Sequence, residues 1–158
     1  TLKILERKDD RGMHLESIAT DMAGIVIEMS GKASKGEGKS LAVSKLNSGE
    51  ALEKFWDIAT TQGATSRLKS EEIPLASITH DIIAVKDGII DTINNREIVK
   101  IAKSIGNPAI KDAGIYVHKM QGDTVKVGDK LMTLYATSSE RMEHALKALD
   151  LEALYTYI

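Results

Sequence analysis

One segment of the sequence has residue types and spacing that could bind a phosphate. Residues 33–40 follow a relaxed P-loop pattern, with Ala33 at the place of the first glycine and then Gly38, Lys39 and Ser40. In a P-loop a strand leads into the loop, and a following hydrophobic strand ends in an aspartate that helps to hold magnesium. Here a helical pattern precedes the loop and no such strand follows. The segment therefore predicts a flexible glycine- and lysine-rich link between two helices.

The other side chains with catalytic or metal-binding chemistry are scattered. The four histidines are His14, His80, His118 and His144. None forms a His-x-x-x-His pair or another close ligand spacing, so no metal site is predicted. Asp9 and Asp10 are adjacent, which makes their side chains diverge, and the charged residues around them indicate a solvated loop. We predict no catalytic, cofactor-binding or metal-binding residue in this chain.

Composition narrows the class of protein. The chain has 158 residues, a net charge of −2, 42% hydrophobic and 28% charged residues, which is typical of a globular protein. It has no basic block, so nucleic acid polymers are not expected partners. The absence of cysteine, of an apolar run of about 20 residues and of a signal peptide fits a cytoplasmic protein with no membrane partner. Because Thr1 enters a helical pattern at once, we expect a piece of a longer protein.

The first third of the chain has helical periodicity. A first long helix is predicted from His14 to about residue 30, a second over residues 39–47 and a third over residues 50–62. The residues expected on the buried face of the first helix are Leu15, Ile18, Ala19, Met22, Ile25, Val26 and Met29. Those expected to be buried on the other two are Leu41, Ala42, Leu46, Ala51, Leu52, Phe55, Ile58 and Ala59.

The second half mixes strands and helices, so the predicted fold class is α+β. A polar stretch over residues 66–75 reads as a linker. Beyond it, Asp87-Gly88 predicts a hairpin between strands at 77–86 and 89–93. Asn94 with Glu97, and Thr137 with Glu140, predict capping boxes that start two helices. The final residues, 154–158, form a candidate strand with Tyr155 and Tyr157 on one face.

A compact β unit organises residues 114–136. Two strand-like runs, 115–120 and 131–136, flank the pairs Gly122-Asp123 and Gly128-Asp129. We expect these glycines at positive φ and these aspartates bonded to nearby backbone. Val125 and Val127 alternate with polar residues between the pairs, which predicts a short half-buried strand.

The same pattern occurs in small modules that carry biotin or lipoate on a lysine. Such a carrier needs a lysine at an exposed hairpin tip, and residues 134–144, the equivalent stretch, contain none. Lys119 and Lys130 are expected to be solvated strand residues. A stand-alone binding module resembling a biotinyl or lipoyl carrier stays an alternative, and a bound cofactor is not expected.

Several motifs together resemble one enzyme family. They are the β unit with its two Gly-Asp pairs, a Ser-Gly-x-Ala-x-x-x-Phe helix at Ser48 to Phe55, and the step Gln62-Gly63. In this order they resemble the C-terminal part of the thymidine and pyrimidine nucleoside phosphorylase superfamily. Residues 114–117 and 133–136 are most similar to its archaeal branch, the AMP phosphorylases. Ala64-Thr65 departs from that pattern, where the family has a second glycine and an acid.

The resemblance implies a domain organisation and an activity. Residues 1–65 would be the C-terminal helices of the phosphorylase α/β domain, 66–75 a linker, and 76–158 the phosphorylase C-terminal α+β domain. The parent enzyme would be a pentosyltransferase that converts AMP and inorganic phosphate into adenine and ribose 1,5-bisphosphate, and that accepts other nucleoside monophosphates. Thymidine or pyrimidine nucleoside phosphorolysis is the alternative.

The family's phosphate- and base-binding motifs do not occur in these 158 residues. This chain alone is therefore expected to be an inactive scaffold that contacts upstream catalytic domains. A homo-oligomer is also expected, because the tail from Leu151 to Ile158 is apolar and aromatic.

Overall fold

The computed structural model describes residues 1–10 and 12–158. The chain divides into two compact units, Thr1–Ile73 and Pro74–Ile158. Unit 1 is helical and unit 2 combines helices with two small antiparallel sheets, as the predicted α+β class requires. None of the helices in the described residues is long and apolar enough to cross a membrane.

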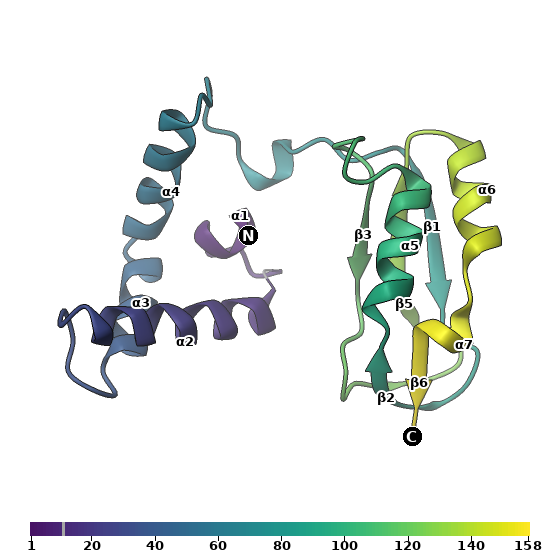
Figure 1. The fold of residues 1–158 in the computed structure, drawn as a ribbon, viewed down its shortest axis with the longest axis horizontal. Helices are drawn as coiled ribbons and strands as arrows, with labels where there is room; N and C mark the ends of the chain where they lie inside the picture. Colours follow the sequence, from purple (N-terminus) through teal and green to yellow (C-terminus); the bar gives the residue numbers. More distant parts are fainter. Residues whose placement is uncertain (11) are drawn as a thin grey trace. The chain divides into compact units, whose positions relative to one another are not determined.

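Unit 1 contains helices α1 (Leu2–Leu5), α2 (Met13–Met29), α3 (Gly38–Asn47), α4 (Glu50–Thr61) and the 3-10 turn η1 (Ser70–Glu72) (Figure 1). The contact between α2 and α3 is a backbone contact. A Cβ atom on Gly24 would lie 2.5 Å from the backbone nitrogen of Lys39, and one on Gly38 would lie 2.1 Å from the carbonyl oxygen of Gly24. Two glycines therefore allow the helices to approach more closely than side chains would permit.

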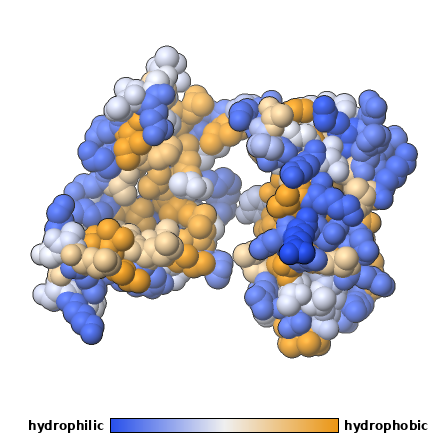
Figure 2. Space-filling view, in the orientation of Figure 1, coloured by the Kyte–Doolittle hydropathy of each residue, from blue (hydrophilic) through white to orange (hydrophobic). Residues whose placement is uncertain are grey.

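The face of α2 that was predicted to be buried is exposed in this unit, so that prediction is wrong. The buried residues of α2 are Glu16, Thr20 and Gly24, and Arg7 pairs with Glu16 at 2.8 Å. The exposed large apolar residues of α2 are Met13, Leu15, Ile18, Met22, Ile25, Val26 and Met29. Figure 2 shows this apolar surface on unit 1.

Helix α4 also differs from the prediction, because it has no fully buried residue and Ile58 is exposed. Phe55 and Trp56 are both half-buried, and their rings meet edge to face with 5.0 Å between centroids. In α3, Ala42 is buried as predicted.

Unit 2 is built from two three-stranded sheets with orders β1-β5-β3 and β4-β2-β6. The strands are β1 (Ile78–Ile83), β2 (Gly88–Ile93), β3 (Gly114–Val117), β4 (Thr124–Val125), β5 (Lys130–Ala136) and β6 (Tyr155–Tyr157). Helices α5 (Asn95–Ile105) and α6 (Ser139–Ala148) pack against each other and against the first sheet, and the short helix α7 (Leu151–Leu154) leads into β6 (Figure 1).

The predicted hairpin at Asp87-Gly88 is wrong. Strand β1 pairs with β5, whereas β2 pairs with β4 and β6. Gly88 does not have the positive φ that a two-residue hairpin turn of type I′ demands. Instead, residues 84–87 connect β1 in one sheet to β2 in the other. In this connection the Asp87 carboxylate accepts a hydrogen bond of 2.8 Å from the backbone N–H of Val127.

The turn chemistry of the β unit is confirmed. Gly122 and Gly128 have φ of 90° and 91°. The Asp123 carboxylate accepts from the backbone N–H of Met120 at 2.7 Å, and that of Asp129 from the N–H of Lys126 at 3.1 Å. The strand between the two Gly-Asp pairs, β4, is shorter than predicted and ends at Val125. Val125 is buried, whereas Val127 lies beyond the strand and is exposed.

The helix starts in unit 2 are confirmed in place, with one shift. Asn94 caps α5 by accepting from the N–H of Arg96 at 3.0 Å, while Glu97 pairs with Lys100. The cap of α6 is Ser138, one residue after the predicted Thr137, and its hydroxyl accepts from the N–H of Arg141. The core beneath these helices is formed by buried residues that include Ile82, Ile90, Ile101, Ile105, Leu131, Leu134, Leu154 and Tyr155.

Candidate functional site

The phosphate-loop-like segment already holds an anion from its own chain. The backbone N–H groups of Gly36 and Gly38 both donate to Oε1 of Glu28, each at 2.9 Å. These are the amides that would otherwise point at a phosphate. The segment is a link between helices α2 and α3, as predicted, and the Glu28 carboxylate fastens it to α2.

The histidines do not assemble a site. His14 and His144 lie exposed on α2 and α6, His80 lies exposed on β1, and His118 follows β3. Within residues 1–10 and 12–158 no group of three or more histidine, cysteine or acidic side chains could hold a metal ion. Asp10 forms an ion pair with Lys3 in a solvated loop.

The most organised polar cluster lies on the sheet β1-β5-β3. The Thr133 hydroxyl donates to Oδ1 of Asp81 at 2.6 Å, and Nε2 of His118 lies 2.8 Å from the same hydroxyl oxygen. Because the single hydroxyl proton goes to Asp81, Nε2 of His118 must carry the proton and donate. Lys130 forms an ion pair with Asp81. The hydrogen bond from Lys130, and to a smaller extent the one from Thr133, hold the pKa of the Asp81 carboxyl below its ordinary value.

This cluster ties three strands together rather than activating a nucleophile. Asp81 and Thr133 are direct cross-strand partners, and Thr133 also faces Tyr116 of β3. The imidazole of His118, which would have to remove the hydroxyl proton of Thr133, instead donates to that oxygen. Lys130 is engaged with Asp81, and Lys119 lies 3.4 Å from Asp129, so neither lysine is the free tip residue that a carrier module needs.

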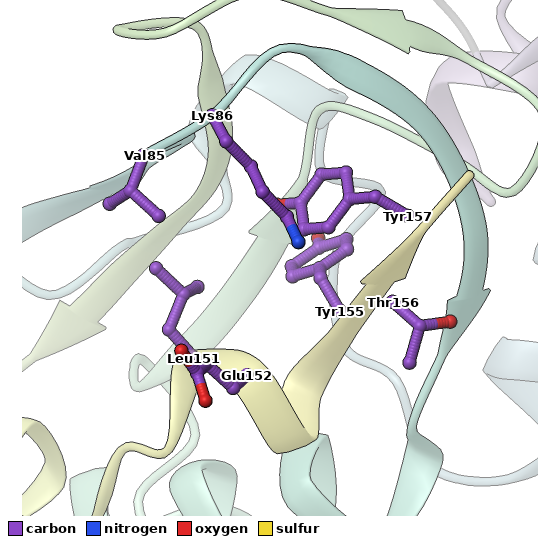
Figure 3. A pocket seen from close by; sticks show the side chains of 7 residues that line it. All are labelled: Val85, Lys86, Leu151, Glu152, Tyr155, Thr156 and Tyr157. Atoms are coloured by element: carbon purple, nitrogen blue, oxygen red, sulfur yellow. The ribbon is translucent and has the colours of Figure 1, made fainter.

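A cavity of about 370 Å³ lies in unit 2 at the edge of strand β6 (Figure 3). Its lining residues are Val85, Lys86, Leu151, Glu152, Tyr155, Thr156 and Tyr157. The Lys86 ammonium lies 4.9 Å from the centroid of the Tyr157 ring, a cation–π distance. Burial raises the pKa of both the Tyr155 and the Tyr157 hydroxyls, and the Tyr157 hydroxyl is buried with no hydrogen-bond partner among the described residues.

Sequence reasoning missed both the polar cluster and the cavity. The cluster depends on the β1–β5 pairing, which the false hairpin signal at Asp87-Gly88 concealed. The cavity could have been approached through the predicted strand at the end of the chain, because Tyr155 and Tyr157 do share one face there, with 6.4 Å between ring centroids. No sequence pattern indicated that Lys86 would lie over the ring of Tyr157.

Comparison with known protein families finds a match for part of unit 2. Residues 89–155, which run from β2 to the start of β6, match the pyrimidine nucleoside phosphorylase C-terminal domain. This part of unit 2 is therefore similar to the C-terminal domain of pyrimidine nucleoside phosphorylases.

The particular relatives are archaeal AMP phosphorylases. The chain is 39% identical to AMP phosphorylase of Methanosarcina mazei over 92% of its own length and 28% of the relative's. It is 43% identical to that of Pyrococcus horikoshii over 81% of its length and 25% of the relative's, and 37% identical to AMP phosphorylase 1 of Archaeoglobus fulgidus over 96% and 29%. The chain thus spans little more than a quarter of the length of the relatives it matches.

Proposed function

We propose that this chain is the C-terminal scaffold of a phosphorylase that cleaves AMP with inorganic phosphate, releasing adenine and ribose 1,5-bisphosphate. The observation that carries the proposal is identity of 39% to an AMP phosphorylase over 92% of the chain. The residues that bind phosphate and base would come from the parts of such an enzyme that these 158 residues do not match. In the proposed reaction phosphate itself is the attacking group, and the proposal includes no cofactor.

The proposed division of labour assigns unit 1 to a larger α/β domain. An apolar face on a long helix has to be covered by another part of the protein. In unit 1 the apolar side of α2 is exposed while Glu16, Thr20 and Gly24 face inward. We place the upstream catalytic part of the enzyme against this exposed side, with unit 2 as the C-terminal α+β domain. A cytoplasmic location belongs to the same proposal.

A chimera tests the proposal. In the Methanosarcina mazei AMP phosphorylase, the region matched by this chain is replaced by residues 1–158, and phosphate-dependent release of adenine from AMP is measured. We expect the chimera to be active, and we expect both the isolated chain and the relative truncated at the same point to be inactive. Activity in the isolated chain, or a folded chimera without activity, would contradict the scaffold role.

The second candidate substrate is thymidine or another pyrimidine nucleoside. It is favoured by the match of residues 89–155 to a domain named for pyrimidine nucleoside phosphorylases. The natural full-length enzyme that contains this chain decides between the two, when release of adenine from AMP and of thymine from thymidine is measured side by side. Cleavage of thymidine alone would keep the superfamily and reject AMP.

We also propose that unit 2 contributes to a homo-oligomer through its exposed apolar residues, among them Val127 and Ile158. The tail itself cannot be removed cleanly, because Leu154 and Tyr155 are part of the core. Ile158→Lys is the better variant, since that side chain is 79% exposed. We expect it to lower the mass of the assembly in light scattering, whereas Val99→Lys on α5, at 50% exposure, should not. An unchanged mass in both variants would reject this interface.

A further inference from the structure

The cavity beside β6 has the features of a small ligand site that the proposed phosphorolysis does not use. Its volume of about 370 Å³ lies near the lower end of the range for small-molecule pockets. Three separate segments form its walls: the loop after β1 with Val85 and Lys86, helix α7 with Leu151, and strand β6 with the two tyrosines. Figure 3 shows Leu151 pointing toward Val85, and Lys86 reaching toward the tyrosine rings.

The walls of the cavity mix apolar and polar side chains, and two of these side chains are fixed by hydrogen bonds. Tyr155 is buried in the core, and its hydroxyl donates to the carbonyl oxygen of Leu131 at 3.4 Å. The Thr156 hydroxyl is engaged with Thr92 at 2.7 Å. These side chains present a preformed surface and would not need to be ordered by a ligand, which lowers the cost of binding.

The lining includes one charge of each sign. Within residues 1–10 and 12–158, neither the Lys86 ammonium nor the Glu152 carboxylate forms an ion pair, and the contact of Lys86 is the cation–π contact with Tyr157. Both charged side chains are exposed, so neither charge loses the free energy of hydration that burial would remove. A ligand with a carboxylate and an ammonium group could satisfy both, whereas a phosphate dianion would meet the repulsion of Glu152.

We propose that this cavity binds a small zwitterion with an apolar body, namely a free apolar α-amino acid. The ligand carboxylate pairs with Lys86, its ammonium group pairs with Glu152, and its side chain packs against Val85, Leu151 and Tyr157. The site is separate from the proposed phosphorolysis, so its test needs no turnover and remains valid whatever the substrate of the enzyme is.

The first experiment is a titration of the 158-residue chain with L-phenylalanine, followed by NMR shifts of the tyrosine ring signals and backbone amides. We expect saturable shifts at residues 85–86 and 151–157. Phenylacetate lacks the ammonium group, phenethylamine lacks the carboxylate and glycine lacks the apolar body. Because one exposed ion pair is worth little, each singly charged analogue should bind about two- to fivefold more weakly, and glycine should give no saturation.

Matched variants locate the site. Lys86→Gln should weaken L-phenylalanine binding about two- to fivefold while leaving phenethylamine binding unchanged. Glu152→Gln should weaken L-phenylalanine binding by the same factor while leaving phenylacetate binding unchanged. Lys111→Gln and Glu143→Gln remove exposed charges elsewhere in unit 2 and should change nothing. Shifts confined to the exposed apolar side of α2, equal binding of all three aromatic probes, or indifference to Lys86→Gln and Glu152→Gln would each overturn the proposal.

Discussion

Gly24→Ala is expected to destabilise unit 1, although the same change in an ordinary helix would stabilise it. Alanine is favoured over glycine by about 1 kcal/mol in a helix interior. In α2, however, the new Cβ would lie 2.5 Å from the nitrogen and 2.9 Å from the Cα of Lys39. These are backbone atoms, so no side chain can rotate away and α3 must move. Overpacking of this kind costs about 1–3 kcal/mol, which exceeds the gain in helix propensity.

Hydrogen exchange measured peptide by peptide reports on the two units separately and is the suitable assay. In Gly24→Ala, amides of α2 and α3 should exchange faster while those of unit 2 keep their protection. Ser17→Ala is the matched control, because Ser17 lies exposed on the same helix. If Gly24→Ala were to slow exchange in α2, propensity would dominate and the close contact between Gly24 and Gly38 would be wrong.

The α2 helix shows where sequence periodicity stops being informative. The apolar spacing correctly predicted a helix, whose observed bounds are Met13–Met29. Periodicity states that an apolar face has to be covered, but not by what. Within unit 1 the close neighbour of α2 is α3, and the fit of their backbones at Gly24 and Gly38 decides which face turns inward. That fit depends on residues distant in sequence, which a local pattern does not contain.

The false hairpin at Asp87-Gly88 has a similar origin. A Gly-containing turn between two β-type runs indicates that the chain changes direction, but not which strands pair afterwards. Here β5 offers β1 a longer partner, from Ile78 opposite Ala136 to Ile83 opposite Lys130, and the Asp81–Thr133 bond strengthens that pairing. The polar cluster was not predicted for the same reason, because Asp81 and Thr133 meet only when β1 lies beside β5.

By contrast, features that depend on a few neighbouring residues were predictable. The positive φ of Gly122 and Gly128, the backbone bonds of Asp123 and Asp129 and the cap at Asn94 each require two to four adjacent residues. The expectation that no catalytic residue lies in this chain depends on the resemblance to the phosphorylases, and it stays a prediction.

The largest effect on unit 2 is expected from Leu134→Ala. Leu134 lies at the centre of β5 with 0% exposure, where it pairs with His80 of β1 and Ile115 of β3. Its side chain belongs to the core that both sheets share with α5 and α6. Removing its terminal carbons loses the free energy of their burial and leaves a cavity that fixed neighbours on both sides cannot close. Substitutions of this kind cost about 2–5 kcal/mol.

A loss of that size is a large share of the stability of a small domain, which is typically 5–15 kcal/mol in total. Urea unfolding followed through the tyrosine signals of unit 2 measures it, since the chain's tyrosines all lie there. The matched control is Val99→Ala, at a side chain that is 50% exposed and lies outside the proposed interface, and it should not lower the free energy of unfolding by more than about 0.5 kcal/mol. Equal losses in the two variants would mean that β5 is not the centre of the core. A loss confined to Leu134→Ala would place the stability of unit 2 in the pairing of β1, β5 and β3, which is the arrangement that the polar cluster at Asp81 and Thr133 requires.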